Sequence, residues 1–397
     1  MKESQMSIPH LFRCPISLDL LTDPVTLCTG QTYERQSIEK WLAAGNLTCP
    51  VTMQKLQDPT IVPNHTLRHL IHQWLQMGSH FQPDYFSKID SLASIKHTLQ
   101  SPQSTINNKL SAVEQLQLLL QESSSSSSSP TPITSCLIQL EFLPLILELL
   151  FGKVEIRPSW EYITFVEHIG CCVLTLLPLG DLQVLNMLQE ESKMEAFLVL
   201  LEQGSSIIKK NLCNIVEITS SSTLTKELCE KLGKNQRLLQ DIVFLVYHNS
   251  EEANYGIKAI SALCCLDSNH ENLVKFGAIN GLITYILNAD KQETNLAAIA
   301  VGRIEQLLRL ESSKSALMEN PEGINGVVKM VFRVSDHEGS GSAINSLMMI
   351  CEESLQAREK AIKGGVLTQL LLLIQSQCSS RTKTKARMLL KLLRSNS

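Results

Sequence analysis

Aromatic side chains are scarce in this sequence: Phe, Trp and Tyr make up only 5% of its 397 residues, whereas leucine recurs throughout. This bias is typical of helices that pack on other helices. An excess of one charge is lacking too, because 35 basic side chains are matched by 39 acidic ones. The balance gives no indication of nucleic acid or a membrane surface as a partner. The length is enough for two or three domains.

A long hydrophobic run is also lacking. Residues 1–5 are polar and no apolar segment of a signal peptide follows, which argues against secretion. The most apolar later run, 142–151, is interrupted by Pro144 and Glu148 and is too short to span a bilayer. The twelve cysteines are scattered, as expected of small buried side chains in a reducing compartment. We therefore expect a cytoplasmic protein without a transmembrane segment, and the nucleus is an alternative location.

Closely spaced metal-binding pairs are missing from residues 12–74. Cys14, Cys28 and Cys49 stand alone in this stretch, without any C-x-x-C motif, whereas a zinc ion needs four donors grouped at short spacing. His65, His69 and His72 fall on a predicted helix, where solvated side chains are a simpler interpretation than metal ligands. We expect no metal and no other cofactor.

The stretch 12–74 nevertheless has the signals of a small folded module. Turn residues on both sides of 25–27 predict a short hairpin. Thr32 is a candidate cap for a helix that would end at Gly45. Asn64 is the candidate cap of a second helix, whose apolar positions recur at helical spacing: Leu67, Leu70, Ile71 and Trp74.

Several short motifs follow one another in this stretch. They are Cys14-Pro15-Ile16-Ser17, Asp23-Pro24-Val25, Gly30-Gln31-Thr32-Tyr33-Glu34-Arg35, Trp41, Cys49-Pro50-Val51-Thr52 and Pro63-Asn64. In this order they resemble the U-box, the zinc-free relative of the RING domain that docks a ubiquitin-charged E2 enzyme.

The resemblance implies two sets of site residues. U-boxes hold E2 in a shallow apolar groove, whose positions in this sequence are Ile16, Leu18, Trp41 and Pro50. Apolar anchors on a polar patch suit a small, transient interface, although burial in the core is the alternative for Trp41. Hydrogen bonds and ion pairs replace the zinc ions in U-boxes, and the matching candidates are Asp23, Glu34, Arg35 and Asn64.

One position departs from the U-box pattern. Many U-boxes carry Arg or Lys shortly after the proline of the second loop, where the cation contacts both E2 and ubiquitin. Met53 occupies that position here. The departure keeps a second interpretation open, in which a weakened U-box leaves a non-enzymatic armadillo adaptor.

The sequence beyond the module begins with a polar segment. Residues 79–104 have the composition of a linker, with a weak helical pattern over 89–99. Residues 123–129 are all serine, and a disordered loop is expected over 121–133.

The remaining sequence contains an internal repeat. Junctions at Gly277, Gly323 and Gly365 lie about 42 to 46 residues apart, each between a helical stretch and a leucine-rich one, as in armadillo and HEAT repeats. Such units bury their apolar faces only against one another, so they stack into a superhelix that can hold a partner. Peptide-binding armadillo proteins carry an Asn ladder, and the matching positions are Asn214, Cys265 and Met349. Only Asn214 fits, which makes it a weak candidate for substrate binding.

The carboxyl end is a basic, amphipathic stretch. Six cations and no acidic residue lie within 381–394, with apolar residues at helical spacing between them. A capping helix of the repeat stack is the first interpretation of this stretch. A nuclear-import signal, or a surface for an acidic partner, is the second.

The order of these parts resembles the plant U-box/armadillo family of E3 ubiquitin ligases. The predicted fold is mostly α: a zinc-free α/β U-box at 8–78, a linker at 79–104, and an all-α armadillo-repeat superhelix at 105–397. The resemblance implies a ubiquitin-charged E2 and a protein substrate as partners, and a homodimer is a further expectation. Ubiquitin would pass directly from E2 to a substrate lysine, so the chain needs no catalytic residue of its own.

Overall fold

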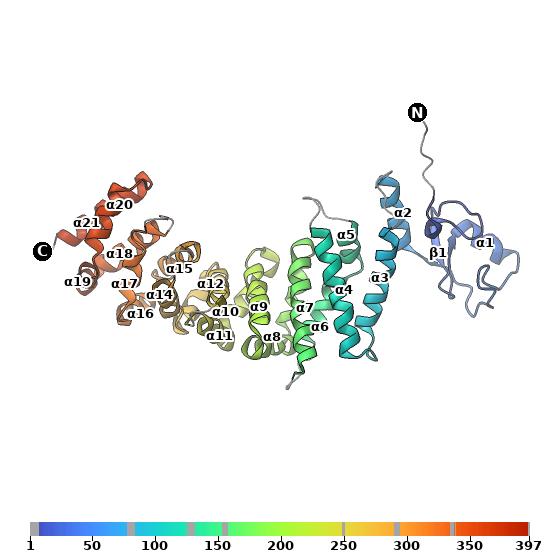
Figure 1. Ribbon diagram of the computed structural model, residues 1–397, viewed down its shortest axis with the longest axis horizontal. Coiled ribbons are helices and arrows are strands. Elements are labelled where there is room, and N and C mark those ends of the chain that lie inside the picture. The colour runs from blue at the N-terminus through green and yellow to red at the C-terminus, as the bar shows by residue number, and fades with distance from the viewer. Residues whose placement is uncertain are drawn as a thin grey trace, which may run out of the picture. The chain divides into compact units, whose positions relative to one another are not determined.

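A computed structural model describes residues 8–77, 84–124, 132–152, 158–247, 251–289, 294–333, 337 and 339–395 (Figure 1). The chain divides into two compact units, Met1–Asp90 and Ser91–Ser397. The predicted mostly α fold, with a small α/β module followed by all-α repeats, is confirmed.

The first unit is built on a three-stranded sheet. Strand β1 (Pro24–Thr26) lies in the middle and pairs antiparallel with β2 (Thr32–Glu34) and with β3 (Val62–Pro63). Two helices accompany the sheet, α1 (Arg35–Ala43) and α2 (His65–Met77), after a short 3-10 turn at His10–Phe12. The hairpin expected around 25–27 is therefore present, with its second strand entering α1 directly.

Large apolar side chains form the core of this unit. The fully buried ones include Phe12, Tyr33 and Ile38. The rings of Phe12 and Trp74 meet edge to face with their centroids 5.6 Å apart, which ties the amino end to α2.

The helix ends of the first unit agree in part with the sequence. Asn64 Oδ1 accepts a hydrogen bond from the backbone N–H of Leu67 at 3.0 Å, so Asn64 caps α2 as predicted. Gly45 has φ +83° directly after α1, which confirms the predicted stop. The prediction that Thr32 caps α1 is wrong, because Thr32 lies in β2 and Glu34 is the residue before the helix.

The predicted linker differs most from the structure. Helix α3 spans Asp84–Gln100 within residues 79–104, and its Leu92, Ile95 and Leu99 are buried. Lys96 Nζ also donates to the backbone oxygen of Leu140 at 2.8 Å. The repeat unit thus begins at Ser91 rather than at residue 105.

The Ser-rich loop is shorter than the predicted 121–133. Helix α4 (Ile106–Ser124) includes residues 121–124, and α5 (Pro132–Gln139) begins at 132. The rest of the predicted loop, 125–131, lies outside the described residues.

The second unit is a series of three-helix repeats. Its later helices are α6 (Phe142–Phe151), α7 (Trp160–Leu176), α8 (Glu191–Gln203), α9 (Ser206–Thr219), α10 (Lys226–Lys234), α11 (Gln236–Tyr247), α12 (Glu251–Leu263), α13 (His270–Lys275), α14 (Ala278–Asn288), α15 (Thr294–Leu307), α16 (Glu311–Glu319), α17 (Gly323–Lys329), α18 (Ser340–Glu353), α19 (Leu355–Lys363), α20 (Val366–Gln375) and α21 (Ser380–Arg394). Short 3-10 turns lie at Leu177–Leu179, Leu182–Gln189, Thr223–Thr225 and Asp267–Asn269.

The third helix of each repeat packs on the third helix of the next. Helices α7, α9, α12, α15, α18 and α21 form one continuous row, and α8, α11, α14 and α17 form a second row. Gly277 and Gly365, with φ +90° and +82°, provide left-handed backbone directly before α14 and α20.

Polar contacts between neighbouring repeats accompany this packing. Asn269 Nδ2 donates to the backbone oxygen of Cys229 at 3.3 Å, Arg303 Nε to Ser261 Oγ at 2.8 Å, and Asn345 Nδ2 to Glu305 Oε1 at 2.6 Å. Each bond joins residues about one repeat apart. Each repeat therefore depends on its neighbours for polar partners as well as for apolar cover.

Two helices of this unit bear on expectations from the sequence. The basic α21 buries Ala386, Leu389 and Leu393 and packs on α18 and α20, where it continues the row of third helices. The stretch Trp160–Leu179 is long and apolar enough to cross a membrane by length and composition alone, but half of it is buried in the fold. It packs between α4 and α9 as a core helix.

Candidate functional site

Two loops of the first unit share one backbone geometry. In the first loop, residues 14–19, the N–H of Cys14 donates to the oxygen of Asp19 and that of Leu18 to the oxygen of Cys14, both at 2.8 Å. The second loop, residues 49–54, repeats these bonds at 2.9 Å, from Cys49 to Gln54 and from Met53 to Cys49. The two loops are thus folded alike around a cysteine.

The fifth residue of each loop has left-handed backbone. Leu18 has φ +61° and Met53 has φ +58°, a conformation that bulky side chains rarely adopt. Both side chains are exposed, Leu18 by 64% and Met53 by 70%. The turn therefore presents a large apolar group to solvent at the same place in each loop.

The cysteine of each loop is buried and receives hydrogen bonds. The backbone N–H of Glu34 donates to Cys14 Sγ at 3.3 Å, Thr29 Oγ1 donates to Cys49 Sγ at 3.3 Å, and the Tyr33 hydroxyl lies 3.0 Å from that sulfur. Burial raises the pKa of the Cys49 thiol, but hydrogen bonds from Thr29, Thr52 and Tyr33 outweigh it and lower the pKa to about 6.

The same balance acts at the first loop. Burial raises the pKa of the Cys14 thiol, but backbone N–H donors, those of Ser17 and Glu34 first, bring the pKa below its ordinary value. Tyr33 interacts with both sulfurs, and burial followed by these interactions raises its pKa. The phenol thus lies where it influences both loops.

The four predicted E2-contact residues differ in exposure. Ile16 is exposed by 36%, while Trp41 and Pro50 are half-buried. Trp41 Nε1 donates to the backbone oxygen of Thr48 at 2.9 Å, which fixes the indole beside the start of the second loop. Leu18, the fourth of these residues, is largely exposed. Each of the four therefore keeps part of its apolar surface open to a partner.

Three further apolar residues lie in this region: Leu47 and Val51 were not predicted, and Met53 was noted only as a departure from the U-box pattern. Leu47, Val51 and Met53 are exposed by about half or more. The sequence signal was present, since Val51 and Met53 match Ile16 and Leu18 by position in their loops, but exposure depends on a turn geometry that sequence motifs do not show.

Asp23 lies at an ion-pair cluster behind the loops. Its carboxylate binds Arg35 Nε at 2.6 Å and also pairs with Arg68 of α2. The backbone N–H of Arg35 donates to the oxygen of Asp23 at 3.0 Å. The cluster joins α1 and α2 to the end of β1.

Glu34 and Asn64 hold the strands from the other side. The Glu34 carboxylate accepts hydrogen bonds from the backbone N–H groups of Thr22 and Asp23 at 2.7 and 3.0 Å. Asn64 Nδ2 donates to the hydroxyls of Thr26 and Thr32 at 3.3 and 3.2 Å. All four predicted structural residues thus make contacts between elements. Among the described residues, no three His, Cys, Asp or Glu side chains are grouped so as to hold a metal ion.

At the three ladder positions, all of which the structure describes, only Asn214 is an asparagine. Asn214 is half-buried on α9, Cys265 is exposed and Met349 is half-buried. The Asn that α9 buries is Asn211, whose Nδ2 donates to the backbone oxygen of Glu167 at 3.4 Å. Asn211 therefore joins two third helices.

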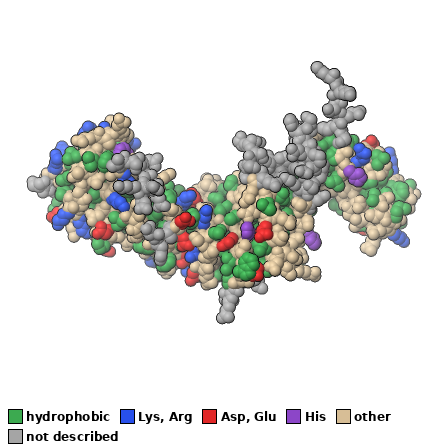
Figure 2. All heavy atoms as spheres, in the orientation of Figure 1, with side chains coloured by type: hydrophobic (Ala, Val, Ile, Leu, Met, Phe, Trp, Pro, Cys, Tyr) green, Lys and Arg blue, Asp and Glu red, His purple; other side chains and the backbone are tan. Residues whose placement is uncertain are grey.

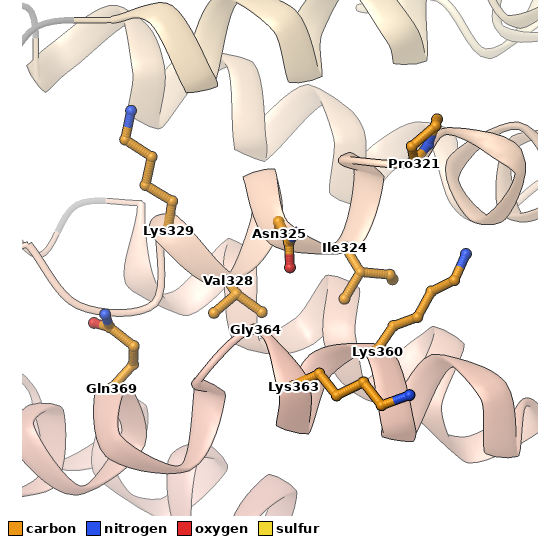
Figure 3. Close-up of a pocket in the computed structure, with 9 residues that line it drawn as sticks. All are labelled: Pro321, Ile324, Asn325, Val328, Lys329, Lys360, Lys363, Gly364 and Gln369. Carbon is orange, nitrogen blue, oxygen red and sulfur yellow. The ribbon is translucent and has the colours of Figure 1, made fainter.

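A hollow of about 540 Å³ lies among α17, α19 and α20, and its lining includes Lys329, Lys360 and Lys363. Figure 3 shows that their side chains diverge rather than converge. Lys329 Nζ donates to the backbone oxygen of Leu287 at 2.7 Å and Lys360 Nζ to that of Met318 at 2.9 Å. These two lysines cap the ends of preceding helices, which is a structural role.

Comparisons with known proteins agree with both parts of the chain. Residues 8–80 match the model of the U-box domain, and residues 163–397 match that of the plant U-box protein ARM repeat region. U-box domain-containing protein 26 of Arabidopsis thaliana is 31% identical, over 98% of this chain and 92% of its own length. U-box domain-containing protein 25 of the same plant is 30% identical over the same shares. The E3 ubiquitin-protein ligase PUB23 of Arabidopsis thaliana is 24% identical, over 98% of this chain and 93% of its own length.

A U-box joined to a stack of ARM repeats, with named E3 ubiquitin-protein ligases among its relatives, defines a U-box type E3 ubiquitin transferase. The chain belongs to the family of plant U-box proteins with ARM repeats.

Proposed function

We propose that the two loops of the U-box recruit a ubiquitin-charged E2 enzyme, and that the ARM repeats bind the protein substrate. The E2 contacts would be Ile16, Leu18, Trp41 and Pro50, joined by Val51 and Met53. The single observation that carries the proposal is the matched pair of loops, each of which exposes apolar side chains at a strained turn. Exposed apolar anchors on a rigid frame suit a transient protein interface.

The chemistry would take place between the two partners. The substrate lysine amine attacks the thioester carbonyl of ubiquitin on the E2 cysteine, forms the C–N isopeptide bond and breaks the C–S bond. The E2 thiolate leaves, and the proton from the amine passes to solvent. The contribution of this chain is to hold both partners together, which turns an encounter of two proteins into a nearly unimolecular step.

The proposal is tested by autoubiquitination with E1, a panel of E2 enzymes, ubiquitin and ATP. Ile16→Ala and Leu18→Ala should lower ladder formation by about tenfold or more, because interface anchors contribute about 2 kcal/mol or more. Both side chains are partly or largely exposed, so the fold should be unaffected. Val62→Ala is the matched control, since Val62 is 62% exposed on β3, outside the loops.

Undiminished ladders from both loop variants would reject this surface as the E2 contact. Wild-type chain that forms no ladder with any E2 would instead favour the non-enzymatic adaptor.

A further inference from the structure

A second hollow of the repeat unit, near α7, α8 and α9, is chemically different from the lysine-lined one. Its volume is about 240 Å³. The lining is mainly apolar and comes from the start of α7, the end of α8 and the start of α9; its apolar members include Tyr162, Ile163, Val166, Val199, Leu200 and Ile208. Small-molecule sites usually measure about 300–1,000 Å³, so this hollow is better matched to one bulky side chain of a protein.

Two exposed apolar residues are close in sequence to residues that line the hollow. Trp160, the first residue of α7, is exposed by 69%, and Ile207 in the first turn of α9 is exposed by 47%. Trp160 lies between the lining residues Pro158 and Tyr162. An exposed tryptophan beside an apolar hollow has the composition of an interface hot spot.

Acidic side chains outnumber lysines in the stretch of chain that forms this hollow. Residues 158–210 contain seven carboxylates and three lysines, but Asp181, Glu190 and Glu191 lie at the ends of α7 and α8 that are remote from the lining. One of those lysines, Lys193, is paired with Glu148. Figure 2 shows Asp and Glu side chains beside Lys and Arg side chains over the middle of the repeat unit.

The acidic residues belong to the elements that line the hollow. Glu161 lies in the first turn of α7 and Glu202 in the last turn of α8. Glu167 of α7 accepts a hydrogen bond from Ser205 Oγ at 2.5 Å, directly at the lining. Glu202 is paired with Arg237 at 3.2 Å, so Glu161 and Glu167 are the carboxylates that form the acidic rim. Lys209 and Lys210 follow the lining residue Ile208, and Lys210 Nζ lies over the ring of Tyr255, 5.5 Å from its centroid.

We infer that this hollow is the docking site for a short segment of a protein substrate in which a bulky apolar side chain is flanked by lysine or arginine. The inference rests on the proposed function, because it assigns one place on the repeats to substrate binding. The apolar side chain enters the hollow against Val199 and Ile163, Trp160 covers it, and the flanking cations lie along the acidic rim.

The test begins with a displayed library of short random peptides selected on the full chain. We expect enrichment of peptides with one Leu, Phe, Met or Trp between basic residues, and weaker binding as salt is added. Trp160→Ala removes the cover, and Val199→Trp fills the hollow. Each variant should weaken binding of the selected peptides by about tenfold or more. Glu161→Gln should weaken binding of these peptides less, and should make the binding depend less on salt concentration.

Leu355→Ala is the matched control, because Leu355 is 63% exposed on α19, away from the hollow. Trp160→Ala keeps the test valid if Val199→Trp fails to fold, since Trp160 is mostly exposed. A selected peptide fused to a lysine-bearing carrier should also be ubiquitinated about tenfold faster than the carrier alone.

Three results would overturn the inference: no enrichment, acidic residues beside the apolar one, or equal binding to all variants. Two results together would assign the hollow to a second copy of this chain instead. The selected peptides would resemble residues 387–392, and Trp160→Ala would abolish dimerisation. The same wild-type and Leu355→Ala preparations are assayed for autoubiquitination, where both should form ladders. A missing wild-type ladder would contradict the proposed function while leaving the peptide result in place.

Discussion

Cys14 and Cys49 are the residues around which the two matched loops of the U-box are folded. Each sulfur is buried beneath its loop and accepts hydrogen bonds from outside it. The loop above then places Leu18 or Met53 in left-handed backbone, at a cost of about 1–3 kcal/mol each. The sulfur contacts and the paired backbone bonds are what hold this strained turn.

We predict that the stability of the U-box rises with pH between about 6 and 9, partly because of Cys49. Its folded pKa is lowered to about 6 from the ordinary thiol value of 9.0, so the stabilisation is complete above pH 9 and is lost as pH falls through 6. About 1–2 kcal/mol of unfolding free energy should depend on pH between 6 and 8, because one pKa unit corresponds to about 1.4 kcal/mol.

Urea unfolding of the full chain measures this dependence. In a Trp160→Phe background, fluorescence reports only Trp41 and Trp74, which both lie in the first unit. Cys49→Ala should remove much of the pH dependence and leave a smaller part from Cys14. If the unfolding free energy of Cys49→Ala depends on pH as steeply as that of its parent, Cys49 is not the source of the pH dependence.

The residue types of the site were predictable, but their exposure was only partly so. The motifs identified Ile16, Leu18, Trp41 and Pro50 through the resemblance to U-boxes. Leu47, Val51 and Met53 share the surface character of these residues. Leu47 and Val51 were not predicted because sequence motifs do not show how far a loop side chain is exposed, and no sequence signal marks the positive φ of Met53.

At the scale of elements, Asn64 joins a helix to two strands. It caps α2 through Oδ1 and holds Thr26 of β1 and Thr32 of β2 through Nδ2. One side chain therefore fixes the position of the sheet against the second helix.

We expect Asn64→Ala to lower the unfolding free energy of the U-box by about 1–2 kcal/mol, the usual cost of a lost cap with an added polar contact. Asn64→Asp keeps the acceptor for the N–H of Leu67 but loses the two donations, so its loss should be smaller. Urea titration monitored by Trp74 fluorescence measures both. Equal stability of Asn64→Ala and wild type would show that the contacts with the strands are dispensable.

The elements that the sequence predicted are those with strong local signals. Asn64 and Gly45 mark helix ends by local chemistry alone. The polar, proline-containing composition of 79–104 predicts a linker with only a weak helix over 89–99, whereas α3 buries Leu92, Ile95 and Leu99. Tertiary contacts, such as that of Lys96 with the oxygen of Leu140, are not visible in a local pattern.

At the scale of the whole repeat unit, stability depends on bonds between neighbours. Asn269 is fully buried and donates to the backbone oxygens of Cys229 at 3.3 Å and Leu263 at 3.1 Å. It thereby joins α10 to the end of α12. The glycine spacing predicted the repeat, but not which residues join adjacent copies.

Asn269→Ala should destabilise the repeat unit by about 2 kcal/mol, because two buried carbonyls lose their donor. In a stack of repeats the effect should be local. Hydrogen exchange is therefore expected to quicken in α10, α12 and α13 and to stay unchanged in α20 and α21. Asn214→Ala, at a half-buried Asn of α9, is the control and should change exchange little. Uniform acceleration along the repeats would contradict nearest-neighbour coupling.

The central claim is that the loops of the U-box promote ubiquitin transfer from E2. Its most direct measurement is the single-turnover discharge of a ubiquitin-charged E2 onto free lysine, with and without the full chain. The chain should accelerate discharge, Leu18→Ala should abolish most of the acceleration, and Met53→Arg should exceed wild type because it restores the cation found in many U-boxes. Discharge that wild type and Leu18→Ala accelerate equally would contradict the claim.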